Sequence, residues 1–130
     1  MASLEDVRQI ALALPQTSEL SRGGLLHWRV ADKGFVWERP LRAKEASALG
    51  SAAPSGPILG ARVEHLLAKE AMLASEPQVF FTTPHFDGYP AVLVRLAEIS
   101  AQTLHEVVVE AWLCRAPRRL AKSYAAEHLA

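Results

Sequence analysis

The sequence has little of several things, and each scarcity excludes a class of protein. One cysteine, Cys114, among 130 residues excludes an internal disulfide and a zinc site built from several cysteines. Fourteen lysines and arginines balance fourteen aspartates and glutamates, which excludes a polybasic nucleic-acid binder. No stretch approaches the ~20 apolar residues of a membrane helix, so we expect no membrane partner.

The remaining composition is that of an ordinary globular protein. Half of the residues are hydrophobic and 22% are charged, and the length is typical of a single domain over residues 1–130. Acidic Glu5 and Asp6 stand where a secretory signal has Lys or Arg, and the first apolar stretch ends at Pro15. Together with the single cysteine, this favours a cytoplasmic protein.

Residue periodicity predicts alternating helices and short strands. Apolar spacing and capping residues predict helices from Ser3 to Pro15, over 44–50, over 64–74 and on both sides of Pro117. Alternating apolar and aromatic residues predict strands over 25–30, 35–40, 58–63, 78–82 and 90–96, the first two forming a hairpin. We expect loops over 16–24 and 51–57.

This order of elements lacks the regular strand–helix–strand alternation of a parallel sheet. It predicts an α+β domain, an antiparallel sheet of about five strands with helices packed on one face. In residues 90–96 both alternating sets of side chains are mostly apolar, so this strand is expected to be central.

The hairpin carries aromatic and basic side chains, and the role of the aromatic ones has two interpretations. Trp28, Phe35 and Trp37 either form a core face or offer stacking surfaces to bases, and the core interpretation is weakest for Trp37. Residues 25–50 hold five basic and three acidic side chains, a balance of +2; three of the basic ones that could contact phosphates are Arg39, Arg42 and Lys44.

Residues 82–90 contain two prolines and a glycine and must turn. In one interpretation Thr83 and His85 face a ligand such as a phosphate, with Tyr89 available for stacking. In the other, Phe86 and Tyr89 fill the core and the turn is purely structural. The segment does not supply a metal site, and we expect neither a metal nor a cofactor.

A second basic cluster lies near the end of the sequence. Residues 115–130 hold four basic side chains and one acidic, a balance of +3, whereas residues 76–114 hold one arginine and five acids, a balance of −4. Arg118, Arg119 and Lys122 could bind phosphates if they met the hairpin cluster in space. Alternatively these charges only solvate helix faces.

Enzyme signatures are absent from the sequence, and we expect no catalytic residue. There is no glycine-rich phosphate loop and no Gly-x-Ser-x-Gly elbow. Cys114 lies on an apolar helical stretch, where a buried and inert thiol is expected.

Five stretches together resemble the MmcQ/YjbR-like family of small bacterial proteins. They are KGFVWERPL (33–41), GPILGARVE (56–64), KEAMLASEP (69–77), FFTTPHFDGYPAVLVRL (80–96) and EAWLCRAPRRLA (110–121). The resemblance implies a curved antiparallel sheet in a "double wing", frataxin-like arrangement and suggests DNA binding, although fold does not fix function. Of the candidate residues, Arg39, His85 and Tyr89 lie within these shared motifs.

Three functions therefore remain open. The leading hypothesis is a non-catalytic protein that binds DNA. The second is a protein for a small anionic ligand, or an unrecognised enzyme, that uses Thr83, His85 and Arg39. The third is an adaptor for other proteins, which an exposed apolar surface would favour.

Overall fold

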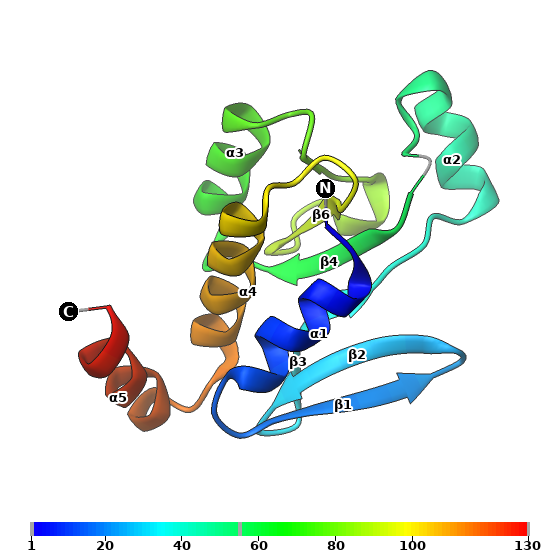
Figure 1. The fold of residues 1–130 in the computed structure, drawn as a ribbon. Coiled ribbons are helices and arrows are strands. Elements are labelled where there is room, and N and C mark those ends of the chain that lie inside the picture. Colours follow the sequence, from blue (N-terminus) through cyan, green and yellow to red (C-terminus); the bar gives the residue numbers. More distant parts are fainter. Residues whose placement is uncertain (1, 55, 130) are drawn as a thin grey trace.

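The computed structural model describes residues 2–54 and 56–129 and shows an α+β domain (Figure 1). Ser55, within the loop expected over 51–57, and Ala130 lie outside the described residues. The helices are α1 (Leu4–Ala13), α2 (Ala43–Leu49), α3 (Leu66–Ser75), α4 (Ala101–Arg115) and α5 (Arg118–His128). The strands are β1 (Thr17–Arg22), β2 (Leu25–Val30), β3 (Lys33–Glu38), β4 (Ile58–Arg62), β5 (Phe80–Phe81) and β6 (Ala91–Arg95).

All six strands belong to one antiparallel sheet in the order β1-β2-β3-β4-β6-β5. The expected hairpin is confirmed, with a tight turn at Ala31 and Asp32, both of which have positive φ. β6 lies between β4 and β5 and is buried on both faces, as its apolar residues predicted. The expected strand over 78–82 is confined to Phe80–Phe81.

The loop expected over 16–24 is wrong, because most of it forms the edge strand β1. Its polar residues hide the strand pattern, but Gly23 and Gly24, both at positive φ, make the tight turn that pairs β1 with β2. Glu19 on β1 lies opposite Trp28 and accepts a hydrogen bond from the indole nitrogen at 3.0 Å. A polar edge strand thus satisfies the polar atom of a fully buried aromatic.

A β-bulge interrupts the alternation of faces that the sequence predicted along β3. The register shifts between Trp28 and Arg29, so that Trp28 pairs with Val36 and Phe35 is the extra residue. Phe35 and Val36 are both fully buried in the main core, whereas Trp37 packs against a second cluster on the other face. The sequence placed Phe35 and Trp37 on one face; the bulge separates them.

The main core lies between the sheet and helices α1 and α4 (Figure 1). α1 begins with the expected capping box, in which Ser3 and Asp6 bond each other's backbone N–H. Trp112 on α4 is fully buried, and its indole nitrogen donates to the carbonyl of Pro15 at 3.2 Å. This bond fixes the end of the first helical segment to the long helix.

The opposite face of the sheet carries a smaller cluster, formed by Ile58, Phe81, Phe86, Ala91 and Leu93. Leu49 of the short helix α2 and Leu41 pack against it, so this face is also partly covered. The three-residue 3₁₀ turn Pro84–Phe86 contributes Phe86 to the same cluster.

The last helix, α5, stands at the edge of the molecule after the extended Ala116–Pro117 link (Figure 1). None of its residues is buried, and it is attached by Leu120 and Tyr124, the latter 5.0 Å from the ring of Trp112. Among the helices in residues 2–54 and 56–129, none combines the length and apolar character needed to cross a membrane.

Candidate functional site

A groove of about 590 Å³ lies between the β2–β3 hairpin and the loop over residues 82–90. We call it the sheet groove; it is lined by Leu25, His27, Trp37, Glu38, Arg39, His85, Phe86, Asp87, Gly88 and Tyr89. Three of these side chains are aromatic and two are histidines. The groove therefore offers flat rings together with hydrogen-bonding atoms.

The hairpin wall of the groove is built by cross-strand neighbours. His27 on β2 lies opposite Trp37 on β3, and Trp37 lies opposite Gly60 on β4. A Cβ added at Gly60 would overlap the indole of Trp37, so the ring lies directly against the glycine. The absence of a side chain at Gly60 thus sets the position of the largest ring in the groove.

His27 is the titratable group of this wall whose pKa is clearly shifted. Partial burial lowers the pKa of His27, and the nearby positive charges of Arg22 and Arg29 lower it further, while Glu38 opposes them. His27 is therefore neutral at pH 7, with one ring nitrogen able to donate and the other able to accept.

The loop wall rests on Phe86, which is buried beneath the groove. The ring of His85 meets Phe86 edge-on at 5.0 Å, and that of Tyr89 lies 6.1 Å from it. Tyr89 is 43% exposed, so its ring does not plug the core as one sequence interpretation required. The prolines and Gly88, at positive φ, shape a turn that buries Phe86 and exposes His85 and Tyr89.

Lys69 on α3 holds this loop from below, a role that the sequence analysis missed. Its side chain is buried, and its ammonium group donates to the carbonyl oxygens of Phe86 at 2.6 Å and Tyr89 at 3.0 Å. Burial lowers the pKa of Lys69, and the carboxylate of Asp87 opposes this shift. A lysine within the apolar stretch of a helix was the available signal, but its partners lie 17 and 20 residues away.

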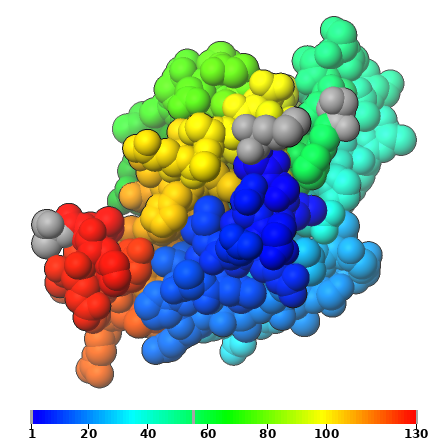
Figure 2. All heavy atoms as spheres, viewed as in Figure 1, coloured from blue at the N-terminus to red at the C-terminus, as the bar shows by residue number. Residues whose placement is uncertain are grey.

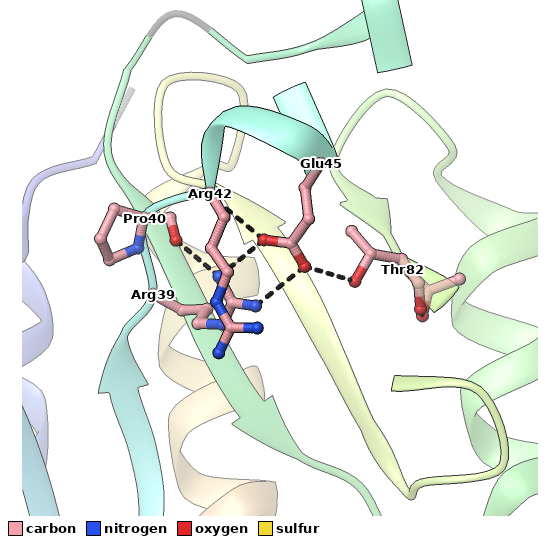
Figure 3. Close-up of polar contacts among 6 residues, drawn as sticks. Arg39, Pro40, Arg42, Glu45 and Thr82 are labelled. Atoms are coloured by element: carbon pink, nitrogen blue, oxygen red, sulfur yellow. Dashed lines mark hydrogen bonds and ion pairs between the residues drawn. The ribbon is translucent and has the colours of Figure 1, made fainter. Parts of the chain in front are cut away.

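Glu45 on α2 organises the other end of the loop (Figure 3). Its two carboxylate oxygens accept hydrogen bonds from the guanidinium of Arg39 at 3.0 and 2.9 Å, and from the backbone N–H of Arg42 at 2.9 Å. The buried hydroxyl of Thr83 donates to the same carboxylate at 3.2 Å. These bonds, led by those from Arg39, lower the pKa of Glu45 to about 2.

This arrangement gives Arg39 and Thr83 a structural role. Both side chains donate hydrogen bonds to Glu45, and the guanidinium of Arg39 also lies 5.3 Å above the ring of Phe86. They fasten the loop to α2. Anion binding by Thr83, His85 and Arg39 stays a prediction, and the structure shows that two of these three residues already bond to Glu45.

The ten residues proposed from the sequence fall into separate places. Trp37, Arg39, His85 and Tyr89 line the sheet groove, and Thr83 lies buried behind it. The exposed Arg42 and Lys44 stand at the start of α2, and the exposed Arg118, Arg119 and Lys122 lie on α5. Helices α2 and α5 occupy opposite ends of the molecule (Figures 1 and 2), so the two basic clusters do not meet.

Within the part of the chain that the structure describes, no three His, Cys, Asp or Glu side chains gather to hold a metal ion. Cys114, on α4, is half-buried. Burial raises the pKa of Cys114, and the carboxylates of Glu110 and Glu64 raise it further. The thiol is thus half-buried where the sequence predicted a buried one, and its inert role stays a prediction.

Comparison with known proteins finds close relatives without an assigned function. The chain is 50% identical over 129 residues to the uncharacterized protein Rv2570 of Mycobacterium tuberculosis, covering 97% of this chain and 98% of that protein. The uncharacterized protein Mb2600 of Mycobacterium bovis matches with the same identity and coverage. The chain belongs to this family of uncharacterized proteins. No family model matches it.

A solved structure supports the fold. The crystal structure of Deinococcus radiodurans protein DR2400, described as a DUF419 domain, superposes with a TM-score of 0.67 over 98% of this chain and 88% of that chain. The two sequences are 18% identical, so the likeness concerns the fold alone. The α+β architecture expected from the sequence is thus shared with a protein seen in a crystal.

Proposed function

We propose that this family of proteins acts by binding, and that the sheet groove holds a nucleobase or a closely similar planar nitrogen-rich ring. The observation that carries the proposal is the groove itself, which brings Trp37, His85 and Tyr89 from two distant segments around about 590 Å³. Aromatic faces bind planar rings by stacking, which contributes about 1–3 kcal/mol per base.

The charges around the groove favour an uncharged or cationic ring over an anion. Among the described residues that line it, Arg39 is the one lysine or arginine, and it is paired with Glu45. Glu38 and Asp87 add carboxylates to the lining. Carboxylate oxygens accept hydrogen bonds from the amino groups and ring N–H groups that nucleobases carry.

A binding role also fits the surroundings of the two histidines. In the described part of the chain neither His27 nor His85 has a hydrogen-bond partner that would orient it as a general base. Their ring nitrogens are therefore available to a ligand.

The test is a fluorescence titration with nucleosides and with short single-stranded oligonucleotides. Trp28 and Trp112 are fully buried, so a change in emission on binding reports on Trp37. We expect Tyr89→Ala and His85→Ala to weaken binding about tenfold each. His105→Ala, an exposed histidine on α4 outside the groove, should change nothing.

Two salt concentrations distinguish the source of the base. Binding of a free nucleoside is expected to be insensitive to salt, whereas contacts to an oligonucleotide backbone weaken as salt rises. If neither nucleosides nor oligonucleotides perturb the emission of Trp37, the proposal fails.

A second candidate is the DNA binding implied by the MmcQ/YjbR-like resemblance. We retain that family name as a proposal, supported by the motifs KGFVWERPL and FFTTPHFDGYP and by the curved antiparallel sheet. Its specific support is the exposed side chains of Arg118, Arg119 and Lys122 on α5. Charge removal by R118Q/R119Q should then weaken duplex DNA binding at low salt without affecting nucleosides.

The cytoplasmic location remains a proposal that rests on the single cysteine.

A further inference from the structure

A second groove, distinct from the sheet groove, lies between α3 and α4. It encloses about 300 Å³. On α3 its wall consists of Ala68, Met72 and Ser75, spaced by four and three residues, which places them along one helical face. On α4, Thr103 and Val107 occupy corresponding positions. The two helices therefore present about two turns each to the same channel. We call it the helix groove.

The floor of the helix groove is apolar. Val63 and Phe80, from the segments that follow β4 and form β5, are buried at its base, and Val107 joins them from α4. Met72 is partly buried against the core and borders the opening. Methionine is unbranched and adapts its shape to different partners, so this wall can accommodate an inserted apolar side chain.

The rim of the helix groove is acidic. Glu64, Glu106 and Glu110 are exposed and Glu76 is half-buried. In the described residues Glu76, Glu106 and Glu110 form no ion pair, and Glu64 lies only within 3.9 Å of the exposed His65. Four carboxylates thus surround an apolar channel with few positive charges to balance them.

The single basic residue of the lining, Arg62, also contacts a ring outside the helix groove. Its guanidinium carbon lies 5.0 Å from the centre of the Tyr89 ring, a cation–π contact at the end of β4. Glu64 and Glu110 both act on the Cys114 thiol near the end of α4, and the positive charges of Arg62 and Arg115 oppose them there. The lining as a whole holds four carboxylates and one guanidinium group.

We propose that the helix groove binds a short amphipathic helix of a partner protein, with apolar anchors on one face and Lys or Arg beside them. Two helical walls over an apolar floor are the geometry in which a third helix packs by its apolar face. The unpaired carboxylates of the rim select cationic flanks, because opposite charges steer binding and acidic flanks would be repelled.

The chain's own basic helix does not meet this requirement. α5 carries Arg118, Arg119 and Lys122, but its apolar residues Leu120 and Tyr124 already pack against its own core. It can present charge to a second copy, but its two large apolar side chains are already engaged. The occupant is therefore a different protein, and self-association through α5 is not expected.

The probe is a fluorescein-labelled peptide of leucine and lysine arranged as an amphipathic helix, with a matched peptide in which glutamate replaces each lysine. Anisotropy is measured at low and at high salt. The lysine peptide should bind and the glutamate peptide should not, and binding should weaken as salt rises. The double substitution E106Q/E110Q should weaken the lysine peptide about tenfold.

The matched control is E70Q/E98Q, which removes the same charge from exposed glutamates outside the helix groove. All four positions are exposed, so neither variant is expected to unfold the chain, and melting temperatures verify this. Equal weakening by the two double variants would show a diffuse charge effect and overturn the proposal. Failure of the lysine peptide to bind, or equal binding of the glutamate peptide, would overturn it as well.

Discussion

The indole of Trp37 lies against Gly60, its antiparallel partner on β4, in the space that a side chain at residue 60 would fill. The sheet groove depends on this contact. The ring forms part of the hairpin wall, and no other residue type at position 60 leaves room for it.

Substitution of this glycine should therefore destabilise the protein and displace the ring. In Gly60→Ala the added Cβ overlaps the indole, and we expect the free energy of unfolding to fall by about 1–3 kcal/mol. Urea denaturation measures the loss, and a shift in tryptophan emission reports the displaced ring.

Gly34 provides the matched control on the neighbouring strand. A Cβ at Gly34 meets nothing within 4 Å, so Gly34→Ala should leave stability and emission nearly unchanged. Equal effects of the two substitutions would show that the loss arises from strand glycines in general and not from the contact with Trp37.

Lys69→Met should loosen the loop that carries His85 and Tyr89. Methionine retains most of the buried stem but cannot donate to the carbonyls of Phe86 and Tyr89. Charge-assisted hydrogen bonds are lost while the cost of burying an ammonium group is relieved, so we expect a net loss of about 1 kcal/mol. Amide hydrogen exchange should accelerate in residues 83–90.

Lys44→Met removes the same charge from an exposed position on α2 and should not change exchange in that loop. If the loop amides of Lys69→Met exchange as slowly as those of the native protein, Lys69 does not hold the loop.

Part of the free energy of unfolding should depend on pH through the ionisation of Glu45. Its pKa falls from 4.5 to about 2 on folding, mainly through the hydrogen bonds from Arg39, so the ionised carboxylate stabilises the fold fully above about pH 4.5. The contribution is lost as the pH falls through about 2. After allowance for screening, we expect Glu45→Gln to cost about 2 kcal/mol at pH 7.

The difference between the native protein and Glu45→Gln should shrink steadily in urea titrations between pH 4.5 and pH 2. Glu98→Gln, at an exposed position, should show a small difference throughout. A difference for Glu45→Gln that stays constant down to pH 2 would contradict the role assigned to the carboxylate.

The titration of His27 should respond to its neighbours in opposite directions. Burial, Arg22 and Arg29 lower its pKa and Glu38 raises it, so Arg29→Gln should move the pKa up toward 6.5 and Glu38→Gln should move it further down. NMR titration of the imidazole protons measures both shifts.

Arg119→Gln on the distant α5 should leave the His27 titration unchanged. Movement in the same direction for Arg29→Gln and Glu38→Gln would mean that a structural change, and not the local charge, determines the pKa.

The short-range signals of the fold were legible from the sequence. Ser3 and Asp6 cap α1, and period-two alternation on both sides of residues 31–34 predicts the hairpin, whose turn the structure places at Ala31 and Asp32. The doubly apolar pattern of residues 91–95 gives a strand buried on both faces. The edge strand β1 was not predicted, because the residues on its two faces are alike in polarity. The bulge at Phe35 was not predicted either, because it depends on the register of the partner strand.

For the candidate site, the sequence predicted which residues to consider but not which of them lie together or bond to each other. Trp37, His85 and Tyr89 were chosen for their chemistry and do share one groove. Arg39 and Thr83 were chosen for the same reason, but Glu45 binds both, across 6 and 38 residues of chain. No local pattern marks Glu45 or Lys69, since each acts on partners that only the folded chain brings near.

The sequence by itself determined the helices and the strands other than β1, because capping, turn chemistry and apolar periodicity act over a few neighbouring residues. Tertiary structure decided which charged side chains are paired with other groups of the protein and which remain exposed to solvent. It paired Arg39 with Glu45, set Lys69 beneath the loop and placed α2 and α5 at opposite ends. The physical reason is that an ionic or hydrogen-bonding side chain takes its role from whatever polar partner lies within a few ångströms, and those partners are distant in the chain.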